Sequence, residues 1–136
     1  MPTTPLNRAL LIMETGVVTT LEVPAPTSDA VAFLQQVCDG FFDVLTLDDG
    51  LAVWFPDDGT GHRANPVATV LVHALSGAVH LLMGPVIITS CADGQIVDMP
   101  SITRQRLRDV VEATRTEPRL LARITAAALI NQAWMS

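Results

Sequence analysis

The chain of 136 residues contains no lysine and no tyrosine. A lysine Schiff base, the phosphate-binding lysine of a P-loop and a tyrosine general acid are therefore excluded as chemistry that this chain supplies. Cysteine is scarce as well, with only Cys38 and Cys91. Two cysteines without a recognisable export signal favour a reducing, cytoplasmic setting.

Long hydrophobic runs are also absent. No apolar run reaches the roughly 18–20 residues that a membrane-spanning helix needs. The first apolar run, residues 9–13, is short and is followed at once by Glu14, which does not resemble a signal peptide. About half of the residues are nevertheless apolar and are spread through the chain, so we expect one domain with a core of its own.

Charge is unevenly distributed along the chain. The first 100 residues hold 11 acidic side chains against Arg8 and Arg63, a balance of −9. Residues 101–136 hold six arginines against three acids, a balance of +3. An acidic body repels nucleic acid, whereas the basic end could attract either nucleic acid or the acidic body of a second subunit.

Hydrophobic periodicity and turn residues predict an α+β fold with a mostly antiparallel sheet. Alternating or apolar runs beside turn signals predict strands at 9–13, 17–23, 41–47, 51–55, 79–90 and 94–99. Capping residues and apolar stripes predict helices at 27–40, 65–77, 102–114 and from about 118 onward. The expected order is β-β-α-β-β-α-β-β-α-α. We expect an α+β domain over 1–115, with a C-terminal helix over 116–136 that packs on the sheet or on a second subunit.

Two details of these helices are predicted from single residues. Asn65 is expected to cap the second helix, with Pro66 at its first position, and Gly40 and Gly77 are placed as C-cap glycines. Val67, Val70, Leu71 and Ala74 are expected to share one face of that second helix.

Three short motifs carry a resemblance to a known family. They are "DG" at 49–50, "NPVAT" at 65–69 and "GPVI" at 84–87, and they follow an N-terminal hairpin and a helix. In this arrangement, residues 7–98 resemble the phage, plasmid and bacterial family called domain of unknown function 3846. The resemblance implies an accessory protein of a mobile element, and it supplies no catalytic residues.

Polar residues around the start of the second predicted helix form the best candidate ligand site: His62, Arg63, Asn65, Thr69 and, in the preceding loop, Asp57. Because a helix N-terminus attracts anions and arginine donates charge-assisted hydrogen bonds, an anion or a nucleotide phosphate could bind there. A purely structural interpretation is also open. Asn65 would cap the helix, Thr69 would bond to its own backbone, and Arg63 would pair with Asp57 or the next aspartate.

No recognisable catalytic or metal-binding spacing accompanies this cluster. His62, His73 and His80 do not form an HExxH motif, and no serine sits in a Gly-x-Ser-x-Gly elbow. Cys38 is expected to lie on the apolar face of a helix and to be inert. We therefore predict no catalytic residue, no metal and no cofactor.

The third predicted helix carries several arginines but lacks the aromatic side chains of a nucleic-acid-binding helix. Arg108 and Glu112 are spaced as an i,i+4 ion pair. We expect a solvated or intersubunit charged face there.

Together these patterns favour a non-enzymatic cytoplasmic binding protein, carried by a phage or plasmid, that acts on a host protein or a small anionic ligand. A homodimer through the C-terminal helix is predicted, and a membrane or nucleic-acid partner is not. Two alternatives stay open. One is a small hydrolase or nucleotide-handling enzyme that uses His62 and a nearby aspartate; the other is an acidic nucleic-acid mimic.

Overall fold

A computed structural model describes residues 6–25, 27–47, 49–57, 61–77 and 79–115, together with 119, 122–124, 126–127 and 129–130. Its strands are β1 (Leu6–Ile12), β2 (Val18–Pro24), β3 (Phe42–Leu47), β4 (Leu51–Pro56), β5 (Val86–Ala92) and β6 (Gln95–Val97). Its helices are α1 (Thr27–Val37), α2 (Pro66–Ser76) and α3 (Ser101–Arg115). The described residues from 119 to 130 are helical as well. The predicted α+β class and element order are therefore confirmed.

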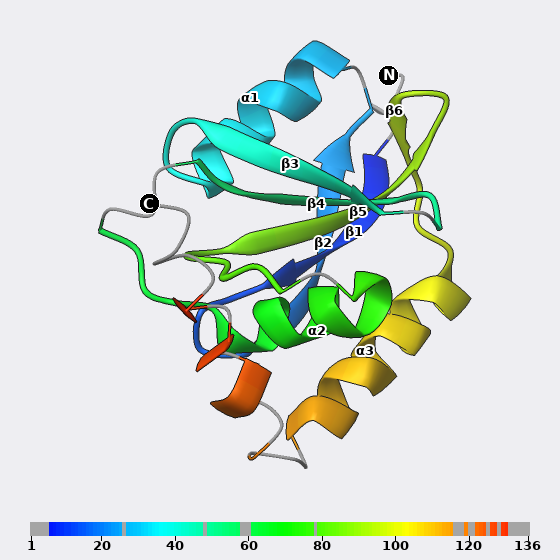
Figure 1. The fold of residues 1–136 in the computed structure, drawn as a ribbon. Coiled ribbons are helices and arrows are strands. Elements are labelled where there is room, and N and C mark those ends of the chain that lie inside the picture. Colours follow the sequence, from blue (N-terminus) through cyan, green and yellow to red (C-terminus); the bar gives the residue numbers. More distant parts are fainter. Residues whose placement is uncertain are drawn as a thin grey trace.

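All strands named above belong to one antiparallel sheet with the order β2-β1-β5-β4-β3. The short strand β6 pairs with the C-terminal end of β5. The hairpins β1–β2 and β3–β4 form the two halves of the sheet, and β5 joins them at the centre (Figure 1). Alternation along β5 explains the central position. Val86 and Ile88 face one side, Ile87 and Thr89 face the other, and all four are buried.

Helices cover both faces of the sheet, as Figure 1 shows with α1 on one side and α2 and α3 on the other. The smaller core lies under α1 and contains Ala9, Val23, Ala30, Leu34 and Ile87. The larger core lies under α2 and α3 and includes Leu10, Ile12, Val53, Leu71, Leu82, Val86, Ile88, Met99, Leu107 and Val111. Odd and even positions of β1 thus go to different cores, which is the period of two expected for a strand.

The strand predicted over 79–90 is shorter in the structure, where β5 begins only at Val86. The preceding segment pairs with the chain before α2 instead. The Asn65 N–H donates to Leu82 O at 2.8 Å, and the Gly84 N–H donates to Arg63 O at 2.8 Å. Periodicity alone did not reveal this pairing, because the same apolar residues suit a strand or a buried extended segment.

The helix predictions hold with two corrections, one at the end of α1 and one on the buried face of α2. Gly77 ends α2 with φ of 74° and a bond to His73 O, as expected. At α1, however, Asp39 with φ of 56° takes the C′ position that was predicted for Gly40, and Gly40 follows it with φ of 130°. The Gly40 N–H donates to Gln35 O, and the Asp39 N–H donates to Gln36 O. This pair of bonds is a Schellman motif, in which Gly40 lies one position later than predicted. Ala74 is exposed, so it does not share the buried face of α2.

The C-terminal residues lie near the end of α2. Ile124 is buried, and Arg123, Ile124 and Ala127 line a cavity of about 290 Å³ with His73 and Val79. Leu120, Leu121, Ala128 and Trp134, which carry part of the predicted apolar stripe, lie outside the described residues. The division into a domain over 1–115 and a helix over 116–136 stays a prediction. Within the part of the chain that the structure describes, no helix is long and apolar enough to cross a membrane.

Candidate functional site

Asn65 occupies the start of α2 and is completely buried. Its Oδ1 accepts from the Ala68 N–H at 3.2 Å, which is the predicted helix cap. Its Nδ2 donates to Ile12 O at 2.9 Å and to Gly84 O at 2.8 Å. One amide therefore joins α2 to β1 and to the segment before β5. Its hydrogen-bonding groups are all committed to the protein backbone.

Thr69 stands one turn further along α2 and is also completely buried. Its hydroxyl donates to Asn65 O at 2.9 Å and accepts from the Leu82 N–H at 3.0 Å. The first bond is the backbone contact that its helical position predicts. The second bond satisfies a buried N–H that has no strand partner. Thr69 thus completes the junction around Asn65.

His62 and Arg63 lie beside this junction and contact a carboxylate from the β1–β2 turn. Glu14 Oε2 accepts from the Arg63 backbone N–H at 3.1 Å, and Glu14 Oε1 lies 3.9 Å from His62 Nδ1. The expected affinity of this loop for an anion is therefore satisfied by a side chain of the protein itself. An added anion would have to displace Glu14. The sequence did not predict that Glu14 lies near this loop, because the two are about 50 residues apart.

The Arg63 side chain is exposed, and its guanidinium makes no hydrogen bond or ion pair with the residues that the structure describes. Asp57 follows β4 and is exposed, and its N–H donates to Phe41 O at 3.1 Å. Within the described ranges, no hydrogen bond or ion pair joins Asp57 to His62 or Arg63. The structure thus brings His62 and Arg63 together with Glu14. The assignment of the five residues as a ligand site stays a prediction.

The remaining histidines and cysteines stand apart from one another. His80 packs against Phe55, with ring centroids 5.6 Å apart, and His73 lies near the end of α2. Among the described residues, no group of three or more histidine, cysteine, aspartate or glutamate side chains could hold a metal ion. Cys38 is buried, and burial raises the pKa of its thiol to about 11, so it is protonated near neutral pH.

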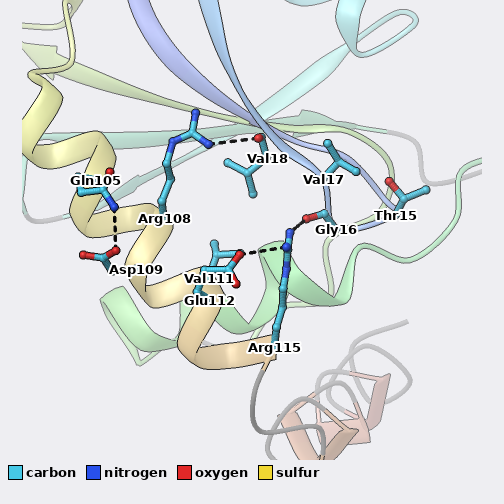
Figure 2. A pocket seen from close by; sticks show the side chains of 10 residues that line it. All are labelled: Thr15, Gly16, Val17, Val18, Gln105, Arg108, Asp109, Val111, Glu112 and Arg115. Atoms are coloured by element: carbon cyan, nitrogen blue, oxygen red, sulfur yellow. Dashed lines mark hydrogen bonds and ion pairs between the residues drawn. The ribbon is translucent and has the colours of Figure 1, made fainter.

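A groove of about 470 Å³ lies between the β1–β2 turn and α3 (Figure 2). We call it the hairpin–α3 groove. It is lined by Thr15, Gly16, Val17, Val18, Gln105, Arg108, Asp109, Val111, Glu112 and Arg115. Its volume falls within the roughly 300–1,000 Å³ that is typical of small-molecule sites.

Two arginines of α3 cross the groove to the hairpin, as Figure 2 shows. Arg108 donates to Val18 O at 3.3 Å and to Thr20 Oγ1 at 2.8 Å. Arg115 donates to Gly16 O and, at 3.0 Å, to Glu112 Oε1. The predicted pair of Arg108 with Glu112 is therefore wrong. The hairpin carbonyl competes successfully for Arg108, and Glu112 takes Arg115 instead.

Sequence reasoning found the arginines of this helix but interpreted them as a charged outer face. A usable signal was present, because Arg108, Val111 and Arg115 are spaced to share one side of a helix. Which element would lie against that side depends on how α3 packs beside α2 and next to the β1–β2 hairpin. No local pattern contains that information.

Comparison of this chain with models of known protein families, with curated proteins and with solved structures found no match. The resemblance to domain of unknown function 3846 therefore stays a prediction from the motifs.

Proposed function

We propose that this protein is a non-enzymatic binding protein and that it holds a small anionic ligand in the hairpin–α3 groove. One observation carries the proposal: two arginines line the same groove and keep uncommitted donors. A guanidinium has five N–H donors. Arg108 and Arg115 each make two hydrogen bonds to acceptors among the described residues, so further N–H groups of each guanidinium are free to bind a ligand.

Anchoring of the arginines supports binding. Each guanidinium is already held against the hairpin, so little side-chain entropy remains to be lost when a ligand binds. Arginine also matches the planar oxygens of carboxylate and phosphate. The groove is therefore preorganised for an anion, whereas the loop at His62 already contains the Glu14 carboxylate.

The chemistry of the lining favours binding over catalysis. Among the described residues that line the groove, Thr15 provides the one hydroxyl and no histidine or cysteine is present. The alternative proposal, a small hydrolase or nucleotide-handling enzyme, depends on His62. Among the described residues, the carboxylate in contact with His62 is that of Glu14, 3.9 Å from Nδ1, rather than an aspartate. A role as a phage or plasmid accessory follows from the resemblance and is part of the same proposal. A cytoplasmic setting is also part of it, and rests on the two cysteines without a recognisable export signal.

Binding is tested by thermal unfolding and calorimetric titration with acetate, phosphate and adenosine monophosphate. A ligand present at about 100 times its Kd should stabilise the native state by about 2.7 kcal/mol. Arg108→Gln should remove this stabilisation. Arg106→Gln is the matched control, because Arg106 is exposed, does not line the groove and carries the same charge.

Two results would contradict the proposal. Equal ligand stabilisation of the two variants would show that the groove is not the site. Turnover of a phosphate ester that is lost in His62→Ala and kept in Arg108→Gln would instead favour the enzymatic alternative.

A further inference from the structure

The hairpin–α3 groove contains charges of both signs. Arg108 and Arg115 balance Asp109 and Glu112, so the described residues of the lining have a formal charge of zero. Figure 2 shows Glu112 between the two arginines along α3. A ligand with several negative charges would be attracted by the arginines and repelled by the two carboxylates at close range.

The carboxylates have acceptor capacity left. Glu112 Oε1 accepts from Arg115, and Asp109 Oδ1 accepts from the Gln105 side chain at 2.9 Å. The second oxygen of each has no hydrogen-bond partner among the described residues. An ammonium group, with three donors and no acceptor, is the complement of such oxygens.

The groove also has an apolar wall. Val17 is 51% exposed, Val18 is half-buried, and Val111 is buried at the base. An exposed valine beside paired charges would lose its contact with water if an aliphatic group covered it. The site therefore offers three kinds of contact: donors for an anion, acceptors for a cation, and an apolar surface.

Resting on the proposed function, we propose that the ligand is a small zwitterion with an aliphatic side chain, of the class of the aliphatic α-amino acids. Its carboxylate binds the free N–H groups of Arg108, and its ammonium group binds the second oxygen of Glu112. Its side chain covers Val17, the exposed valine of the groove. Such a ligand satisfies both signs of charge without adding net charge to the groove.

The experiment compares leucine with its two halves and with an inorganic anion. Wild-type protein is titrated with leucine, 4-methylpentanoate, 3-methylbutylamine and phosphate, and binding is followed by calorimetry and by chemical shifts of the hairpin amides. Leucine should bind about tenfold tighter than either half, because each half lacks one charge-assisted interaction.

Variants separate the roles of the two charges. Glu112→Gln should weaken leucine binding, because the acceptor of its ammonium group is lost, and should not weaken the binding of 4-methylpentanoate, because a carboxylate that repels an anion is removed. Asp93→Asn is the matched control, since Asp93 lies in the exposed β5–β6 turn, outside the groove, and carries the same charge. Its leucine affinity should equal that of the wild type.

The outcomes distinguish this inference from the broader function. Binding of phosphate or 4-methylpentanoate as tightly as leucine, with loss in Arg108→Gln, would overturn the zwitterion and leave the anion site standing. Absence of any ligand whose binding depends on Arg108 would overturn both.

Discussion

At the scale of single residues, Asn65 and Thr69 show how a local prediction can be correct and incomplete. The sequence predicts that Asn65 caps a helix and that Thr69 bonds to its own backbone, and both contacts are present. The contacts with Ile12, Gly84 and Leu82 were not predictable, because those residues lie 13 to 53 positions away. These contacts make the cluster a structural junction.

Thr69→Val tests that junction. The variant leaves the buried Leu82 N–H without its acceptor, so the free energy of unfolding should fall by about 1–3 kcal/mol. Thr114→Val is a matched control: Thr114 is also buried, but among the described residues its hydroxyl bonds only to Val110 O, in its own helix. It should cost less than about 1 kcal/mol. Urea unfolding measures both, and equal losses would contradict the role assigned to Thr69.

Cys38 allows a second prediction at this scale. Its thiol is buried with a pKa of about 11 against the ordinary 9.0, because burial disfavours the thiolate. At pH 8 a thiol reagent should therefore modify Cys91 in the native protein and Cys38 only after unfolding. Measured on the Cys91→Ala variant, rapid labelling of the native state would contradict this.

The same shift predicts a pH dependence. The folded state keeps the Cys38 proton more tightly than the unfolded chain does, so its contribution to stability is complete below pH 9.0 and is lost as pH rises toward about 11. Unfolding free energies across this range should fall less steeply for Cys38→Ala than for the wild type.

At the scale of elements, turn chemistry and periodicity were sufficient for the order of strands and helices. They failed where an extended segment pairs outside the main sheet. Gly84 lies in that segment with φ of 77°, and a Cβ there would stand 2.9 Å from His62 Nδ1 and 3.0 Å from Pro56 Cγ. The segment is therefore positioned by close packing against the loop before α2.

Gly84→Ala should consequently be more damaging than an alanine at another left-handed glycine. Gly61 has φ of 83° and open space around a Cβ, so Gly61→Ala should cost only the backbone strain, about 1–2 kcal/mol. Gly84→Ala adds overpacking and should cost a further 1–3 kcal/mol, roughly. Thermal unfolding of the two variants gives the comparison. Equal midpoints would mean that His62 moves aside freely.

At the scale of the whole molecule, the arrangement of the helices decides where charge and apolar surface are exposed. The acidic body and basic C-terminal part were evident from the sequence. The sequence did not reveal that two of the arginines line a groove with the β1–β2 turn, because this depends on how α3 packs relative to the hairpin. Exposed apolar surface occurs in the C-terminal segment, where Leu129 is 53% and Ile130 is 57% exposed.

We predict that these two side chains take part in a homodimer. The double variant Leu129→Asp, Ile130→Asp should shift a micromolar sample from dimer to monomer in light scattering after size exclusion, because desolvating carboxylates in an interface is costly. Ile102→Asp is the control, since Ile102 is 70% exposed on α3. A wild-type protein that is monomeric at this concentration would contradict the prediction.

The sequence by itself determined the class of the fold, the order of its elements and the residues that begin and end α2. These depend on backbone preferences and periodicity over a few neighbouring residues. Only the tertiary structure decided that Glu14 occupies the loop at His62 and that Arg108 and Arg115 meet the β1–β2 turn. Such contacts join residues between about 50 and 100 positions apart. Their existence depends on how helices pack across a sheet, which is set by the whole core.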